Sequence, residues 1–366
     1  MATRSPTERR GAMVRLVESK TVQRVAPPLL LPAGPYLDLA GEEFGRQLLL
    51  TTANNGIEYC LRPDFTLPIA KSYLDDGMLG VPGAFTYLGP IFRQENGVPV
   101  EYDQAGLELL GQPDANGALD QVLTFARWAL AIYDITSPAI RLGGVGLFEA
   151  FLKAMDISPQ WQARIRHRFG HPTALQRLMD RLTNPEHRLT GTAPDARDSI
   201  VEIVTDNMLS AGLSLVGSRQ PDEIADRYLE KQALDAAPIP EAMVQLLVDY
   251  LAVSDAPVRA LDTIWQMTRK AGIDIEGPLN AVRSHAAALV ALSPKATVTF
   301  DASFSPRLDY YTGVVFEMTG EEGDILASGG EYDRLLDRLG APKHVTASGC
   351  ALWTERLEQE AVRING

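Results

Sequence analysis

The sequence of 366 residues is poor in cysteine and lacks long apolar runs. Its only cysteines, Cys60 and Cys350, are too few for a disulfide framework or a cysteine metal cluster, which is typical of a reducing compartment. No apolar run reaches the roughly 18 residues that a membrane-spanning helix needs. The first residues are not followed by the apolar stretch of a secretory signal. The sequence therefore predicts a cytoplasmic protein without a membrane partner.

Positive charge is also scarce. Lysine and arginine number 34 against 47 aspartate and glutamate residues, so the formal net charge is -13 and the pI about 4.9. A molecule of this sign repels phosphate backbones unless it carries a concentrated basic patch. The most basic stretch, RIRHRFGH at residues 164–171, is short and interrupted, so we expect no nucleic-acid partner.

Several common functional motifs are missing. The sequence has no P-loop, and GGVG at residues 143–146 lacks the third glycine of a dinucleotide fingerprint, so it is interpreted as a tight turn. His167 and His171 have the spacing of a metal-binding pair. Gly170 and Pro172 disfavour the continuous helix that such a pair needs. No residue stands in a nucleophile elbow, so we expect no metal, no cofactor and no covalent hydrolase chemistry.

Short apolar runs and turn signals predict a mixture of strands and helices. Residues 13–25 have the spacing of an amphipathic helix, and the following VAPPLLLP is expected to be extended. Residues 48–110 alternate apolar runs with turns, which predicts antiparallel strands and one helix at residues 67–74. The other predicted elements are a helix at 119–133, a strand and turn in IRLGGVGLF, strands in ATVTFDASF and YTGVVFEMTG, and a helix at 351–362.

The middle of the chain differs from both ends. Residues 149–293 have helical patterns almost throughout, with breaks at SPQ, HPT, TNPEH, GTAPDA and AAPIPEA. Strand-rich segments, residues 1–148 and 294–366, bracket this helical section. The order predicts an α+β core in two parts that carries a helical insertion.

Four separated segments carry a family resemblance. They are RVAPPLLLPAGPYLDLAGEE, CLRPDFTLPIAKSYL with TYLGPIFRQE and YDQAGLELLG, RLDYYTGVVFEM, and SGGEYDRLLDRLG with SGCALWTERL. In order and spacing they resemble motif 1, the Arg-Pro-acid-x-Thr segment with motif 2, the histidine-recognition signature and motif 3 of class II aminoacyl-tRNA synthetases, in the histidine-specific branch. The resemblance covers about residues 13–363 and is weakest in the helical middle. It implies an antiparallel sheet flanked by helices and a dimer interface at Pro28.

The resemblance also implies a pocket for free histidine. This ligand offers an ammonium, an imidazole and a carboxylate, so a selective pocket needs acceptors for the first two and a cation or donors for the third. The matching positions are Asp64, Phe65, Thr66, Arg93, Gln104, Glu108, Arg307, Tyr310 and Tyr311.

Individual roles follow from the same resemblance. Asp64, Thr66 and Gln104 match positions that hold the amino group in the family. Glu108 and Tyr311 match groups that contact the imidazole, with a second tyrosine beside them. The two tyrosines also fit ordinary core aromatics, and Asp64 also fits a helix N-cap. Glu108 stands in the apolar run AGLELLG, where an unpaired carboxylate is costly, so we expect it to have a partner.

The positions that serve nucleotide chemistry depart from the family. Activation needs cations to stabilise the charge that develops when a carboxylate attacks ATP. Arg93 keeps the motif 2 arginine that faces the carboxylate and the α-phosphate. The family's catalytic arginine falls on Pro306, and Arg307 follows one residue late, so strand alternation turns it to the opposite face unless a bulge compensates. The further motif 2 arginines correspond to Val98 and Val100.

Motif 3 and the end of the chain differ as well. The family has a glycine three residues before the motif 3 arginine, where this sequence has Trp353 before Arg356. An indole occupies about 200 Å² and fills much of an adenine slot, so ATP is not expected to bind as in the synthetases. The sequence ends ten residues after Arg356. We therefore expect no anticodon-binding domain and no tRNA partner.

A retained amino acid pocket beside an altered nucleotide site resembles the regulatory-subunit branch of this family, which serves ATP phosphoribosyltransferase. That resemblance implies a non-catalytic homodimer of histidine biosynthesis that activates the short-form catalytic subunit and carries feedback regulation by L-histidine. One rival is a truncated histidyl-tRNA synthetase-like enzyme that forms histidyl-adenylate. Another is a histidine sensor with a different partner. Whether histidine binds this pocket or a subunit interface stays open at this point.

Overall fold

The structure is a computed structural model that describes residues 4–19, 21–39, 42–95, 99–183, 238–306 and 310–365. The chain divides into two compact units, of which the first combines residues 1–150 with 252–366 and the second comprises residues 151–251. Helices α12 (Pro257–Lys270) and α13 (Glu276–Leu292) therefore belong to the first unit, although the sequence analysis assigned them to the helical middle section.

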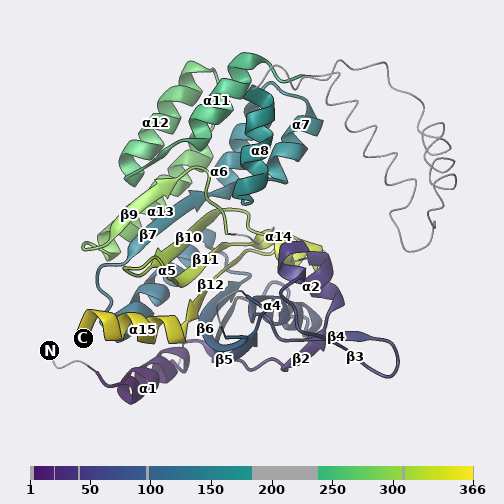
Figure 1. Ribbon diagram of the computed structural model, residues 1–366, viewed down its shortest axis with the longest axis vertical. Helices are drawn as coiled ribbons and strands as arrows, with labels where there is room; N and C mark the ends of the chain where they lie inside the picture. Colours follow the sequence, from purple (N-terminus) through teal and green to yellow (C-terminus); the bar gives the residue numbers. More distant parts are fainter. Residues whose placement is uncertain are drawn as a thin grey trace. The chain divides into compact units, whose positions relative to one another are not determined.

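A large sheet organises the first unit (Figure 1). Within the described residues it has nine strands in the order β1-β5-β6-β12-β11-β10-β7-β9-β8. Neighbours run antiparallel except β1 with β5 and β7 with β9. The strands are β1 (Gln23–Arg24), β5 (Gly83–Phe92), β6 (Glu101–Leu110), β7 (Ala139–Gly144), β8 (Ser254–Asp255), β9 (Thr297–Asp301), β10 (Val314–Thr319), β11 (Ile325–Glu331) and β12 (Ala347–Trp353). The predicted α+β class with a mainly antiparallel sheet is confirmed.

Two helices predicted from periodicity are present in this unit. The prediction at residues 67–74 corresponds to α4 (Thr66–Asp75), and that at residues 119–133 to α5 (Ala115–Ile132). Helix α5 begins earlier than predicted because the Asp114 side chain accepts a hydrogen bond from a backbone N–H of its first turn.

The two helices cover opposite faces of the central strands. Alternate residues of a strand point to opposite faces. Glu108 of β6 accepts a hydrogen bond from Thr66 of α4, so α4 lies on that face. Cys350 of β12, in the alternate register, contacts the Val122 carbonyl of α5, so α5 lies on the other face. Glu108 is therefore enclosed between the sheet and α4.

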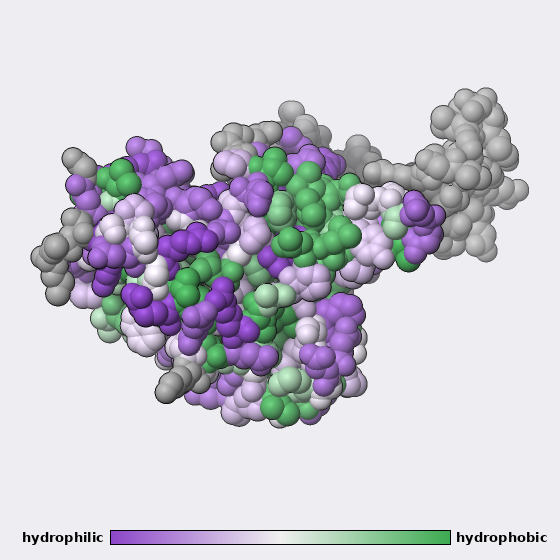
Figure 2. All heavy atoms as spheres, turned by 90° about the horizontal axis from the view of Figure 1, so that it is seen from below, coloured by the Kyte–Doolittle hydropathy of each residue, from purple (hydrophilic) through white to green (hydrophobic). Residues whose placement is uncertain are grey.

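A second sheet is smaller and leaves apolar side chains exposed. It has the order β2-β4-β3 and is antiparallel. Its strands and the adjoining short helices are β2 (Leu30–Pro32), β3 (Leu50–Thr52), β4 (Glu58–Leu61), α2 (Gly34–Leu39) and α3 (Glu42–Gly45). Leu29, Leu30, Leu50 and Ile57 are 48, 48, 47 and 47% exposed, and Figure 2 shows apolar residues gathered in patches on the face it presents. Such grouping marks surfaces that bind a partner.

The predicted helix at residues 13–25 is wrong in its bounds. Helix α1 spans Pro6–Val17, and residues that were predicted to be helical form strand β1 instead. The helix starts early because Ser5 and Glu8 form a reciprocal capping box and proline occupies the first turn. The capping box therefore sets the start of this helix, although the spacing of apolar residues predicted a later one. The buried face of the helix includes the charged residue Arg9.

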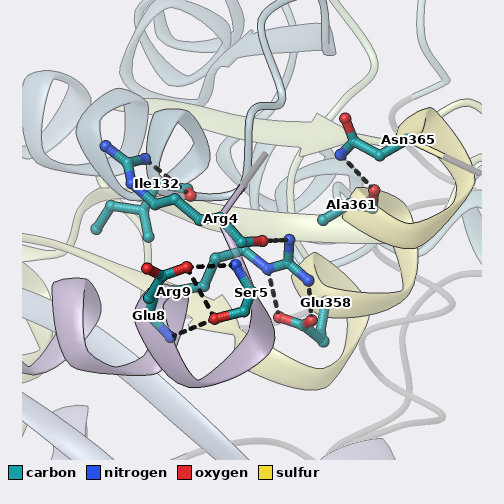
Figure 3. A network of polar contacts seen from close by, with 8 residues as sticks. All are labelled: Arg4, Ser5, Glu8, Arg9, Ile132, Glu358, Ala361 and Asn365. Carbon is teal, nitrogen blue, oxygen red and sulfur yellow. Dashed lines mark hydrogen bonds and ion pairs between the residues drawn. The ribbon is translucent and has the colours of Figure 1, made fainter. Parts of the chain in front are cut away.

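An ion pair of Arg9 and exposed hydrogen bonds of Arg4 connect α1 and the residues before it to α15 and α5 (Figure 3). Arg9 is 4% exposed and donates to both carboxylate oxygens of Glu358 in α15 (Thr354–Asn365). Arg4 donates to the Ala131 and Ile132 carbonyls at the C-terminus of α5, at 3.3 and 3.1 Å. A cation at this end of a helix satisfies carbonyls that lack intrahelical partners.

The final predicted helix, residues 351–362, also has the wrong start. Residues 351–353 continue strand β12, because they pair with β6 in the centre of the sheet. Helix α15 begins only at Thr354, and its hydroxyl donates to the Asp103 carbonyl at 3.2 Å. Sheet pairing thus overrides local helix propensity.

The tight turn predicted for GGVG at residues 143–146 is absent. Strand β7 ends at Gly144 and α6 (Val145–Ala154) starts at the next residue. The junction is held because the Val145 N–H donates to the Gly313 carbonyl at 2.9 Å. A Cβ atom at Gly143 would lie 2.2 Å from the Phe304 carbonyl oxygen, so glycine serves close packing there.

The second unit is helical wherever it is described. Its helices are the end of α6, α7 (Pro159–Arg166), α8 (Pro172–Thr183) and α11 (Glu241–Leu251). The predicted breaks SPQ, HPT and AAPIPEA precede or begin these helices and are confirmed, whereas TNPEH, apart from its first residue, and GTAPDA lie outside the described residues. Across the described part of the chain, no helix combines the length and the apolar character needed to cross a bilayer.

Candidate functional site

Glu108 lies at the centre of a cluster of hydroxyl groups. It is 1% exposed on β6. Its Oε1 accepts hydrogen bonds from the Thr66 hydroxyl at 2.7 Å and from the Tyr87 hydroxyl at 3.3 Å, and its Oε2 accepts one from the Tyr332 hydroxyl. The expectation that this carboxyl has a partner is confirmed. All three of these donors are neutral hydroxyl groups.

Burial raises the pKa of Glu108 to about 8, while the hydroxyl donors of Tyr332 and Thr66 pull it down. Burial thus favours the protonated form of this carboxyl, whereas the three hydroxyl donors favour the ionised form. Space around it is minimal, since a Cβ atom at Gly349 of the neighbouring strand would lie 1.7 Å from its Oε2. The glycine in the SGC block thus makes room for the Glu108 side chain.

Tyr332 is a site residue that the sequence analysis missed. It follows β11, is 2% exposed, and its ring lies edge-on to that of Tyr310, with centroids 5.8 Å apart. The tyrosine lies in the block SGGEYDRLLDRLG, but its contact with Glu108 joins residues 224 positions apart, so the block itself contains no signal for it.

Tyr310 and Tyr311 are both brought to this cluster. They are 5 and 9% exposed, and their ring centroids lie 5.2 Å apart. Both residues precede β10. The strand predicted from YTGVVFEMTG began at Tyr311, whereas β10 begins at Val314. Burial raises the pKa of both phenols, and the Glu108 carboxyl adds to this effect, so both stay neutral donors.

The turn before α4 carries three candidate residues. The Asp64 Oδ1 accepts the Leu67 N–H at 3.1 Å, so the helix-capping alternative describes a real contact. Burial raises the pKa of Asp64, while the nearby Arg93 charge lowers it. Phe65 stacks on Tyr87 with ring centroids 4.2 Å apart and planes 9° apart. Thr66 reaches Glu108, so this turn links the acidic and aromatic parts of the site.

Arg93 lies at the cationic end of the site. Its Nε donates to the Pro63 carbonyl at 2.7 Å, and its Nη1 lies 3.8 Å from Glu95. Arg356 lies 3.8 Å from the other oxygen of Glu95, so one carboxylate is shared by two arginines. The Tyr36 hydroxyl, which was not among the predicted site residues, is buried without a partner among the described residues. Burial raises the pKa of Tyr36, and the Asp64 carboxyl adds to this effect.

Trp353 and Gln104 face each other across β12 and β6. Gln104 is 1% exposed, and the Trp353 indole is half-buried with the Arg356 guanidinium 5.2 Å from a ring centroid. The filling of an adenine slot by this indole stays a prediction. Val100 is 44% exposed, and its match to a motif 2 arginine stays a prediction.

The catalytic-arginine segment is described only in part. Pro306 is buried and belongs to no strand. Arg307 and Val98 lie outside the described residues. Among the described residues, no three histidine, cysteine, aspartate or glutamate side chains are grouped in a way that holds a metal ion.

Comparison with known proteins shows the family of this chain. A family model described as histidyl-tRNA synthetase matches residues 2–193 and 226–357. A curated relative from Agrobacterium fabrum, an "ATP phosphoribosyltransferase regulatory subunit", is 34% identical over 358 residues, which is 95% of this chain and 95% of that protein. The chain belongs to the family of ATP phosphoribosyltransferase regulatory subunits. A relative of the same name from Rhizobium rhizogenes is also 34% identical, over 95% of this chain and 96% of its own.

Solved structures show the same fold. A Bacillus halodurans protein described as an ATP phosphoribosyltransferase regulatory subunit/histidyl-tRNA synthetase has a TM-score of 0.64 at 21% identity, covering 99% of this chain and 82% of its own. Histidyl-tRNA synthetase from Nostoc has a TM-score of 0.61 at 16% identity, covering 98% and 71%. The family resemblance stated from the sequence motifs is thereby confirmed at the level of family and fold.

Proposed function

We propose that the chain is a non-catalytic regulatory subunit of ATP phosphoribosyltransferase that activates a short-form catalytic subunit in the first step of histidine biosynthesis. The observation that carries this proposal is full-length similarity to curated regulatory subunits, at 34% identity. Two features of the site support it: the cluster of hydroxyl groups around Glu108, and the two arginines that share the Glu95 carboxylate. The rival enzyme that forms histidyl-adenylate is not favoured, since this pairing competes with the phosphates of ATP.

L-Histidine is the proposed ligand of the Glu108 site. A neutral imidazole has one donor and one acceptor. Glu108 and the surrounding tyrosines offer both an acceptor and O–H donors, which matches that pattern. Asp64, Thr66 and Gln104 supply oxygens for the ammonium group, and Arg93 supplies charge for the carboxylate. Binding at this position biases the assembly toward a less active state, as a coupling between two sites.

Self-association is the proposed use of the small sheet. The exposed Leu29 and Leu30 directly follow Pro28, the residue matched to the interface proline of motif 1. Burial of apolar area contributes roughly 25 cal/mol per Å², which makes this the favourable face for a second copy. The proposed homodimer presents two histidine sites to the catalytic partner.

The decisive measurement is phosphoribosyl transfer by a short-form catalytic subunit, with and without this chain, across histidine concentrations. We expect activation by the chain and loss of activation as histidine rises. No activation would refute the regulatory role. A parallel pyrophosphate-exchange assay with histidine and ATP is expected to show no turnover, and turnover would favour the adenylate-forming enzyme.

Calorimetry locates the histidine site. Glu108→Gln is expected to weaken histidine binding by about tenfold or more, because a buried hydrogen-bond partner of the ligand is changed. Glu101→Gln, at an exposed position of the same strand, is the matched control and should bind normally. Equal affinities of the two variants would place histidine elsewhere, including at a subunit interface.

A further inference from the structure

Arg62 connects the small sheet to the large one within the first unit. It directly follows β4 and is 3% exposed. Its Nη1 donates to the Pro27 carbonyl, and its Nη2 donates to the Pro90 carbonyl at 2.8 Å. Its backbone N–H donates to the Leu29 carbonyl at 2.7 Å. Arg62 thus fastens residues 27–29, which lead into β2, to strand β5.

The buried charge of Arg62 lacks a carboxylate partner among the described residues. Among the described residues its guanidinium forms no ion pair with a carboxylate, and its Nε has no hydrogen-bond partner. Burial accordingly lowers the pKa of Arg62. A buried cation held mainly by carbonyls costs stability compared with an apolar side chain of similar volume. Its presence therefore indicates a role other than packing.

An aromatic stack extends from Arg62 into the candidate site. The Arg62 Cζ lies 3.9 Å from the centroid of the Phe65 ring. Phe65 in turn stacks on Tyr87, with centroids 4.2 Å apart and planes 9° apart. Cation–π contact and offset stacking both favour this layered arrangement. The guanidinium therefore determines where the Tyr87 ring lies.

The far end of the stack meets Glu108. The Tyr87 hydroxyl lies 3.3 Å from the Glu108 Oε1 and 3.3 Å from the Cys350 carbonyl. A Cβ atom at Gly106 would lie 2.3 Å from that hydroxyl, so the phenol has little freedom on this side. Phe65 is also next to Thr66, the other donor to Oε1. A shift of the stack consequently moves both donors to this oxygen.

We propose that Arg62 is a positioning residue that couples residues 27–29 and the adjoining apolar sheet to the Glu108 site through Phe65 and Tyr87. Order in the small sheet and binding at the site then depend on each other. If the proposed homodimer forms on that sheet, subunit association and histidine binding become linked. The ligand-dependent part of this inference rests on the proposed function, whereas the ligand-free part does not.

Hydrogen exchange of the ligand-free protein tests the coupling directly. Arg62→Lys keeps the charge but removes the planar fork and the stacking surface. We expect amide exchange to rise about fivefold or more both at residues 27–32 and in β6 around Glu108. Arg24→Lys is the matched control, because Arg24 lies in nearby β1 and forms only an exposed ion pair with Glu18. It should change exchange at neither place.

A second experiment adds histidine to the same proteins. In the wild type, histidine is expected to slow exchange at residues 27–32, and in Arg62→Lys this remote effect should disappear while binding persists at reduced affinity in calorimetry. Absence of histidine binding to the wild type would refute the proposed function but leave the ligand-free comparison to decide the role of Arg62. Should Arg62→Lys fail to fold, Phe65→Leu removes the middle of the stack and has the same expected pattern.

Increased exchange confined to residues 27–32 would overturn the proposal, because Arg62 would then be a local anchor of that segment. An unchanged remote response to histidine in Arg62→Lys would overturn it as well.

Discussion

The two ends of the candidate site are built on different physical principles. At the Glu108 end, a buried carboxyl whose pKa is raised by burial to about 8 is surrounded by neutral hydroxyl donors. At the Arg93 end the groups are charged and more exposed to solvent. Arg93, Glu95 and Arg356 expose 12, 25 and 21% of their side chains. The enclosed end suits selection of one small molecule by hydrogen bonds, while at the charged end one carboxylate offsets part of the charge of two arginines.

The difference shows that recognition of an amino acid and activation of a nucleotide depend on different groups in a synthetase-like fold. Recognition depends on donors and acceptors held in place by the fold, and the proposed histidine site assigns this role to the groups around Glu108. Nucleotide activation depends on uncompensated positive charge, and the described arginines at this end are paired with Glu95. A regulator of this kind needs only the first property.

Gly349→Ala tests the enclosed end most severely. The new Cβ atom would lie 1.7 Å from the Glu108 Oε2 and 2.8 Å from the Leu107 carbonyl, so the chain must deform. We expect a loss of about 3 kcal/mol in the free energy of unfolding, measured by denaturant titration. Gly277→Ala is the control, because no atom lies within 4 Å of its Cβ position on α13. A small gain in stability is expected there.

The pH dependence of stability tests the charge state of Glu108. Its pKa is near 4.5 when unperturbed and about 8 in the fold, so the folded state holds a proton that the unfolded state releases between these values. Stability is therefore highest below the lower value and is lost as pH rises through the upper one. The wild type should lose about 2 kcal/mol more between pH 6 and pH 8 than Glu108→Gln does. Parallel curves for the two proteins would show that Glu108 is ionised in the fold.

Tyr332→Phe removes one donor from Glu108 and leaves the ring. We expect a loss of about 1–2 kcal/mol in stability, because a buried carboxyl oxygen loses a hydrogen bond. The pKa of Glu108 should rise further, since this hydroxyl lowers it in the wild type. Denaturation and a pH titration measure both effects. Tyr59→Phe on β4 is the control, and an equal response of the two variants would contradict the assigned role.

Glu95→Gln tests the charged end and should have the smallest effect on stability. Both ion pairs of Glu95 are long and partly exposed, so we expect a change within about 0.5 kcal/mol. Removing the shared carboxylate frees two arginines, so binding of inorganic pyrophosphate in calorimetry should strengthen a few-fold. Glu101→Gln carries the same charge change and should not alter it. Unchanged pyrophosphate binding in Glu95→Gln would mean that Glu95 does not neutralise this end.

The sequence motifs predicted which residues lie at the candidate site better than they predicted the contacts among them. Thr66 and Glu108 were selected from separate segments and contact each other, as do the neighbouring pair Tyr310 and Tyr311. Tyr332 and Arg62 were missed, because their importance comes from contacts with residues far away in the sequence. No local pattern distinguishes a tyrosine that reaches a buried carboxyl from one that fills the core.

Local rules also decided element boundaries unevenly. The sequence contains the capping box at Ser5 and Glu8, but the spacing of apolar residues further along predicted a helix that begins later. The strand at residues 351–353 carries no such local signal. Its identity comes from pairing with β6, which only the assembled sheet provides.

The amino acid sequence by itself determined the family, the α+β class, the acidic charge and the residue types available for binding a small amino acid. Only the tertiary structure decided the protonation of Glu108, the sharing of Glu95 by two arginines and the stack that begins at Arg62. The physical reason is that pKa values, ion pairing and stacking depend on burial and on distances between residues that the chain order leaves far apart.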